Sequence, residues 1–111
     1  MKADHDFKIG AAVSEAVTTS EAIFDVSPLA GSGNNPSYPM TVEIQADGCD
    51  MYLRQGKSDV ALDATAADNA KLFSGQSWRV TVEKEGDAYF AREAVSGSGT
   101  IRATRLDKVN A

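Results

Sequence analysis

The stretch TVEIQADGCDMYLRQG, residues 41–56, decides the fold class of this chain. Apolar residues occupy every second position on both sides of an Asp-Gly pair: Val42, Ile44 and Ala46 before it, and Cys49, Met51 and Leu53 after it. Period-two alternation is typical of a strand with one buried face, and an Asp-Gly pair between two such runs predicts a β-hairpin. We therefore expect two paired antiparallel arms whose apolar side chains share one core with Trp78, Val80 and Ile101.

The same pattern recurs along the chain. Further strands are predicted at residues 21–26, near Val60 and Leu62, and at residues 78–82, 88–91 and 100–104, whereas residues 67–73 hold at most one helical turn. Seven or eight short strands, with turn signals roughly every 8 to 12 residues, are typical of an antiparallel β-sandwich or jelly roll. The sequence therefore predicts an all-β, single-domain fold.

The N-terminal region permits more than one interpretation. Phe7, Ile9 and Val13 alternate as in a first strand, but residues 10–20 also suit a short helix or an extended arm that orders on assembly. We expect residues 1–20 to form an N-terminal arm or first strand, and residues 21–111 to form the β-sandwich domain.

Length and charge restrict the class of partner. The chain has 111 residues, a net charge of −5 and a pI of about 4.7. One domain fits this length, and the acidic balance argues against nucleic acid as the main partner, although Arg92, Arg102 and Arg105 could form a local basic patch. The sequence predicts no membrane span and no signal peptide, because acidic residues interrupt the apolar run near the N-terminus.

Cys49 is the one cysteine. With one cysteine, the chain can form neither an intrachain disulfide nor a cysteine-based metal site. The position of Cys49 on a strand predicts that it is a small buried apolar residue. One cysteine is consistent with synthesis in a reducing cytoplasm.

No catalytic constellation is evident. His5, the one histidine, lies between two aspartates near the N-terminus, and no G-x-S-x-G motif is present. Asp47 and Asp50 are read as solvated turn residues rather than a glycosidase pair. The glycine-rich loop at residues 29–39 is followed by a strand, not a helix, so a phosphate site is not expected. We predict no enzyme activity, no catalytic residue and no cofactor.

Two kinds of binding site have partial support in the sequence. Asp59, Asp63 and Asp68 could offer oxygens to calcium, but their spacing matches no EF-hand loop, so no metal site is predicted. A carbohydrate site needs an exposed aromatic platform, and the candidates are Trp78, Tyr38, Tyr52 and Tyr89. Trp78 has the inward parity of its strand, which predicts a core position.

The second half of the chain carries three short structural motifs: DMYLRQG at residues 50–56, ATAADNAKLFSGQSWRVTV at 64–82 and DAYFAREAVSGSGTIRATRL at 87–106. Together they resemble small β-sandwich virion proteins of tailed bacteriophages. The resemblance implies a capsid decoration or cement protein, made in the host cytoplasm and located on the phage head. It also implies binding to the major capsid protein or other virion proteins at capsomer junctions, assembly as a homo-oligomer with a trimer favoured, and Arg102 and Thr104 in an interface.

Two alternatives stay open. The chain could be a neck, tail or fibre component of the same virion, which copy number per particle would distinguish. It could instead be a carbohydrate-binding β-sandwich, which water-exposed Trp78 fluorescence would favour.

Overall fold

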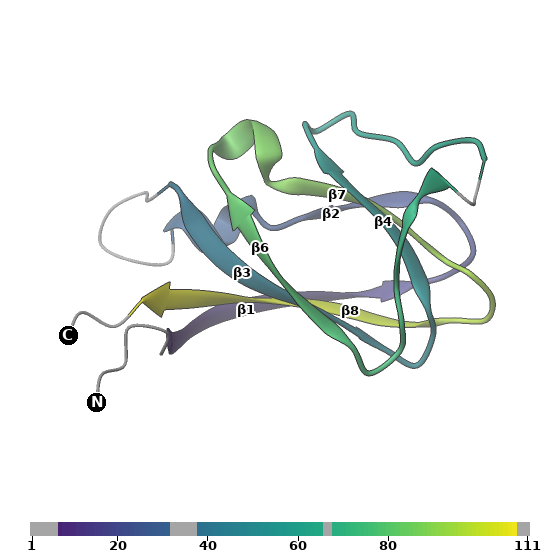
Figure 1. Ribbon diagram of the computed structural model, residues 1–111, viewed down its shortest axis with the longest axis horizontal. Helices are drawn as coiled ribbons and strands as arrows, with labels where there is room; N and C mark the ends of the chain where they lie inside the picture. Colours follow the sequence, from purple (N-terminus) through teal and green to yellow (C-terminus); the bar gives the residue numbers. More distant parts are fainter. Residues whose placement is uncertain (1–6, 32–37, 66–67, 109–111) are drawn as a thin grey trace.

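The computed structural model describes residues 7–31, 38–65 and 68–108, which form two antiparallel four-stranded sheets packed face to face (Figure 1). Sheet A contains, in spatial order, β1 (Phe7–Val17), β8 (Gly99–Lys108), β3 (Met40–Asp47) and β6 (Ser77–Val82). Sheet B contains β2 (Ala22–Asp25), β7 (Tyr89–Ala94), β4 (Met51–Gly56) and β5 (Ala70–Leu72). The predicted all-β sandwich is confirmed.

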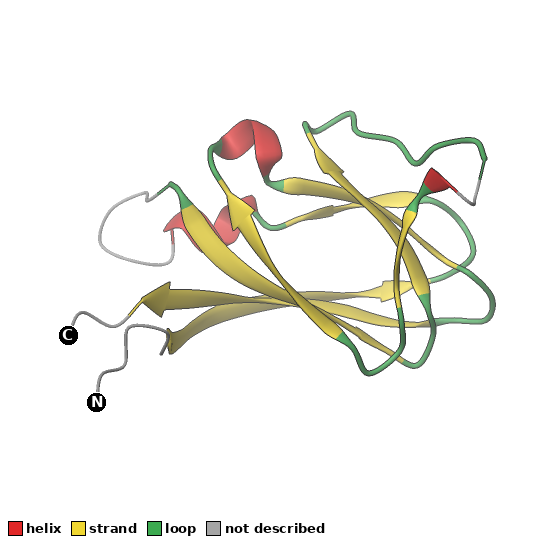
Figure 2. Cartoon of the chain, in the orientation of Figure 1, coloured by secondary structure: helices red, strands yellow, loops and turns green. Residues whose placement is uncertain are grey.

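Helix is confined to short pieces. The 3-10 helices η1 (Ser27–Gly31) and η3 (Glu85–Asp87) lie in connections between the strands (Figure 2). No helix within the described ranges has the length and apolarity needed to cross a membrane.

The strand pairs are nested. The first strand pairs with the last, the second with the seventh, the third with the sixth and the fourth with the fifth. Two more pairings, β3 with β8 and β4 with β7, join these pairs into the two sheets. This nesting is the jelly-roll arrangement, and it sends each connection from one sheet to the other except the one between β4 and β5.

The predicted hairpin over residues 41–56 is therefore wrong. β3 belongs to sheet A and β4 to sheet B, so the Asp47-Gly48 corner carries the chain across the sandwich. Period-two alternation buries one face of a strand whether its neighbour lies beside it or opposite it across the core, so the pattern could not separate these cases. Gly48 takes a φ of +87°, which a glycine adopts without strain.

Other local predictions also need correction. Residues 57–63 contain no strand, so the short strand near Val60 and Leu62 is wrong. Residues 70–72, where a helical turn was considered, form β5. The strand after the turn at residues 85–87 exists as β7, but it pairs with β2 and β4 rather than with β6. Residues 7–17 form β1, paired with β8.

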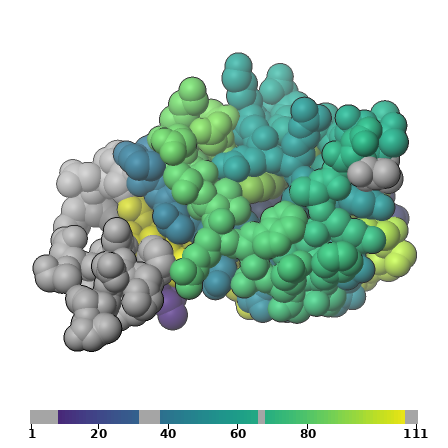
Figure 3. Space-filling view, viewed as in Figure 1, coloured from purple at the N-terminus to yellow at the C-terminus, as the bar shows by residue number. Residues whose placement is uncertain are grey.

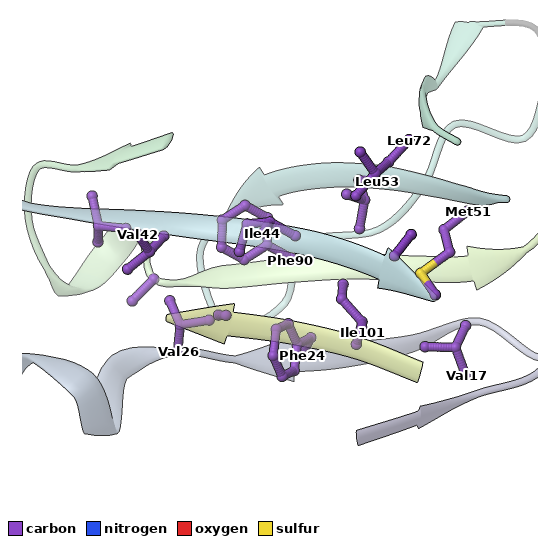
Figure 4. Packing of buried hydrophobic residues seen from close by; sticks show 14 of the residues in the cluster. Val17, Phe24, Val26, Val42, Ile44, Met51, Leu53, Leu72, Phe90 and Ile101 are labelled. Atoms are coloured by element: carbon purple, nitrogen blue, oxygen red, sulfur yellow. The ribbon is translucent and has the colours of Figure 1, made fainter. Parts of the chain in front are cut away.

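The core lies between the sheets. Val42, Ile44, Met51 and Leu53 are buried there together with Cys49 and Ile101, as predicted. Figure 4 shows Ile44 of sheet A beside Phe90 of sheet B near the centre of this layer.

One glycine is required by close packing. A Cβ on Gly99 would collide with the carbonyl oxygen of Asp47 and lie 2.9 Å from the Sγ of Cys49. Gly99 thus lets β8 begin against the corner that carries the chain from β3 to β4.

Candidate interface at the open flank of the sandwich

The two long sides of the sandwich differ, and we name them the closed flank (β1 and β2) and the open flank (β4, β5 and β6). At the closed flank Arg92 of sheet B reaches Glu15 of β1, with its Nε donating to the Glu15 Oε2 at 2.8 Å and its Nη2 2.6 Å from the same oxygen. The Arg92 side chain is 9% exposed and that of Glu15 is 32% exposed. This ion pair fastens the two sheets together along that side.

At the open flank, no ion pair between described residues joins the two sheets. β5 pairs with only three residues of β4, so β4 from Arg54 onward has no partner strand on that side. Between β4 and β6 lies a groove of about 180 Å³, lined by Ile44, Leu53, Gln55, Ala70, Trp78, Val80 and Phe90. Figure 3 looks onto this side, where the surface is hollowed between β6 and β4.

Trp78 and Val80 border this groove. Their register places them opposite Ile44 and Val42 of β3, which turns them inward as predicted. Both are nevertheless only partly buried and pack against the rim of the core. The predicted core position of Trp78 is therefore half right: the parity is correct, but no strand covers the indole on the open side.

Hydrogen bonds show how the β6 backbone is oriented. The Ala46 N–H donates to the Gln76 carbonyl at 3.3 Å. The backbone N–H and C=O groups of the even-numbered residues in β6 therefore point toward β3. In an antiparallel pair the alternate residues direct both backbone groups to the other side. The backbone N–H and C=O groups of Ser77 and Thr81 therefore point toward the open flank. There the Thr81 carbonyl accepts a hydrogen bond from the Gln55 side chain at 3.1 Å.

Gln55 links the sheets at one end of the groove. Its Nε2 also donates to the Asp87 carbonyl at 2.9 Å, so one amide from β4 serves a carbonyl of β6 and a carbonyl of η3. Sequence reasoning missed Gln55 because a glutamine at an inward position is an exception to the alternation, and that exception was the available signal.

The opposite edge of sheet A has the same character. The same alternation, followed from β6 through β3 and β8 to β1, directs the backbone N–H and C=O groups of Ala12, Ser14 and Ala16 away from β8, toward the free edge of the sheet. The β1–β8 register shifts once, between Ile9 and Ala12, and then runs without interruption to Val17. Ile9, beside that shift, is 77% exposed.

The edges of the two sheets differ in length. Sheet A ends in strands of 11 and 6 residues, and sheet B ends in strands of 4 and 3 residues. Short edges are one of the devices by which proteins prevent strand addition. Sheet B uses this device and sheet A does not.

Cys49 is buried, as predicted, and its thiol is free. Burial, reinforced by the nearby carboxylate of Asp50, raises the pKa of the Cys49 thiol above its ordinary value. The protonated thiol is a poor nucleophile and a poor metal ligand, which fits a packing role.

The acidic candidates have structural roles. A carboxylate oxygen of Asp50 accepts the Ser74 N–H at 2.9 Å, and Asp47 lies 3.9 Å from Arg102. Asp63 accepts the Thr65 N–H at 2.9 Å, as in a turn. Across the described ranges, no group of three or more His, Cys, Asp or Glu residues is placed to hold a metal ion.

The three arginines considered as a basic patch do not form one. Arg92 points into the sandwich, and Arg105 donates to the carbonyls of Leu29 and Ala30 at 2.9 and 3.2 Å. Arg102 and Thr104 face outward from sheet A, opposite Gln45 and Glu43 of β3. The prediction of a local basic patch at these arginines is wrong.

The aromatic candidates are scattered. Tyr38 and Tyr89 pack against the core, and Tyr52 is partly buried on β4. Burial, with smaller effects from Glu85, Tyr89 and Asp25, raises the pKa of Tyr38 above its ordinary value. His5 and residues 32–37 of the glycine-rich loop lie outside the described ranges.

Comparisons with known proteins give one result. No family model and no curated protein matches the chain. A solved structure reported as Bacillus endospore appendages, a family of disulfide-linked pili, matches over 99% of this chain and 96% of its own. The two share 16% sequence identity at a TM-score of 0.47. A likeness at this level assigns no function to the chain.

That result corrects the expectation drawn from the phage-like motifs. The full-length match is to a pilus protein and not to a phage capsid protein, so the predicted capsid decoration role and the phage-head location are wrong. The predicted trimer and the capsid-protein partner were implied only by the phage resemblance, so they are no longer supported. The motifs that carried the resemblance describe strands and turns common to many sandwiches.

Proposed function

We propose that the protein is a structural, non-enzymatic subunit that assembles with copies of itself by adding strands at the edges of sheet A. The observation that carries this proposal is the contrast between the sheets. Sheet A ends in strands of 11 and 6 residues, whereas sheet B ends in strands of 4 and 3 residues.

An edge strand presents backbone N–H and C=O groups that can pair with a strand of another chain. Proteins that stay monomeric usually protect long edges with prolines, inward charges, bulges or a covering loop. β6, with the sequence SWRVTV, contains no proline or glycine and keeps one register against β3 throughout. β1 keeps one register from Ala12 to Val17, after the shift between Ile9 and Ala12, and carries one inward charge at Glu15 that is paired with Arg92.

The open flank adds apolar surface to the backbone edge. Trp78 and Val80 are partly exposed beside β6, and a strand added there would cover them. Strand addition of this kind derives affinity from backbone hydrogen bonds and specificity from alternate side chains in pockets.

Disulfide cross-links along such an assembly are not part of the proposal. One cysteine per chain can join two chains at most, and Cys49 is 7% exposed. The subunits would therefore be held by non-covalent contacts, which dissociate in urea whether or not a reducing agent is present.

The experiment is a measurement of assembly state. Light scattering coupled to size exclusion, over a range of protein concentrations, should show species larger than one chain, and negative-stain microscopy should show regular oligomers or filaments. A chain that remains monomeric at the highest soluble concentration would contradict the proposal.

A further inference from the structure

The geometry points to a specific mode of assembly: the β6 edge and its groove in one copy receive β1 of the next copy, head to tail. This inference rests on the proposed self-assembly and adds which two surfaces meet. The structural feature behind it is that sheet A has an edge strand at each flank, β1 at the closed flank and β6 at the open flank.

Strand direction permits this junction. Neighbouring strands in sheet A are antiparallel at every pairing, so β1 and β6, separated by β8 and β3, run in opposite directions. A copy displaced along the sheet therefore places its β1 antiparallel to β6 of the preceding copy. Because the sheet has four strands, each added copy repeats this relation and the antiparallel ladder continues.

The backbone rows at the two edges match in length. The outward residues span Ala12 to Ala16 on β1 and Ser77 to Thr81 on β6, two rows of equal extent without a bulge. Gln55 already donates one hydrogen bond to the Thr81 carbonyl. A carbonyl oxygen has a second lone pair, so an incoming N–H can be added there.

Charge favours unlike flanks. In the strands of the open flank the charged residues are Arg54, Lys71 and Arg79, all basic and all exposed. The closed-flank strands β1 and β2 carry Lys8, Glu15 and Asp25, and Glu15 is paired with Arg92. The segment between β4 and β5 adds acids at Asp59, Asp63 and Asp68.

This charge pattern discriminates between modes of pairing. Joining two β6 edges about a two-fold axis would bring basic strands together, whereas joining β6 to β1 brings the basic strands to strands that carry one base and two acids. A junction between unlike surfaces does not close on itself unless its rotation forms a ring, so it produces rings or open filaments rather than dimers.

Paired proline variants test the inference. Thr81→Pro removes an outward N–H from β6 and Ser14→Pro removes one from β1, while the residues bonded to β3 and β8 keep theirs. Thr81→Val and Ser14→Val are the matched controls, because they alter the side chain and leave the N–H in place. Circular dichroism and urea unfolding show whether each variant folds, and Ser77→Pro, at the first residue of β6, replaces Thr81→Pro if that variant does not.

Head-to-tail assembly makes a distinctive prediction for the mixture. Each proline variant alone should be monomeric, and the two together should form a one-to-one heterodimer, because one retains β6 and the other retains β1. Both valine controls should assemble like the unmodified chain. Analytical ultracentrifugation measures all of these states.

Three results would contradict the inference, and a fourth would contradict the proposed function. Proline variants that assemble like the unmodified chain would overturn the inference. So would monomeric variants that remain monomeric when mixed, or Ser14→Pro chains that dimerise alone through β6. A monomeric unmodified chain would instead overturn the proposed function itself.

Discussion

The ion pair at the closed flank leads to an asymmetric mutational prediction. Arg92 and Glu15 contact each other across the sandwich, but Arg92 is 9% exposed and Glu15 is 32% exposed. Removing Glu15 leaves a guanidinium buried without a counter-charge. Removing Arg92 leaves a carboxylate that water already reaches.

The magnitudes follow from that difference. Glu15→Ala should lower the free energy of unfolding by about 3 kcal/mol, the usual cost of orphaning a buried charge. Arg92→Met keeps most of the aliphatic stem and should cost about 1 kcal/mol. The double variant should cost less than the sum of the two, because both charges have gone together.

Urea unfolding followed by Trp78 fluorescence measures these free energies. Ser14→Ala is the matched control on the same strand, since Ser14 is exposed and faces outward, and it should lie within about 0.5 kcal/mol of the unmodified chain. If Arg92→Met proved more destabilising than Glu15→Ala, the reasoning from burial would be refuted.

Two further predictions concern the corner between β3 and β4. Gly99→Ala should lower the free energy of unfolding by at least about 2 kcal/mol, because its Cβ would meet the Asp47 carbonyl, whereas Gly31→Ala, with nothing within 4 Å, should change it by less than about 0.5 kcal/mol. Equal urea midpoints for these two variants would contradict the close approach. Burial raises the pKa of Cys49, so the unfolded chain loses this proton at lower pH than the folded one, and stability should fall as the pH rises past about 8.5. Cys49→Ala should flatten that alkaline decline in a urea titration across pH, and native Cys49 should react with a thiol reagent far more slowly than the unfolded chain; rapid native labelling would contradict the burial.

The sequence contained enough information to predict strands and their buried faces. Val42, Ile44, Met51 and Leu53 lie in the core because period-two alternation follows directly from strand geometry. Pairing could not be predicted in the same way, because a jelly roll joins strands far apart in the chain, such as β1 with β8. The Asp47-Gly48 corner has the composition of a hairpin turn, yet it carries the chain between sheets.

The candidate interface was harder to foresee. Half-burial of Trp78 depends on β5 stopping after three residues, and no residue near Leu72 marks that end as distinct from an ordinary strand end. Edge position is likewise a property of the whole sheet. By contrast, the acids Glu15 and Asp25 of β1 and β2 and the three bases of β4, β5 and β6 are visible in the sequence. Only the strand order shows that these charged residues lie on opposite flanks of the sandwich.

The most direct test of head-to-tail assembly is chemical cross-linking between the two edges. Ser14→Cys and Thr81→Cys, introduced together in a Cys49→Ala background, place one thiol on the outer face of each edge strand. A short bismaleimide should join these chains into a ladder of covalent oligomers, and either cysteine alone should yield no more than traces of dimer. Efficient dimers from Thr81→Cys alone, or no cross-linking by the pair, would contradict the account.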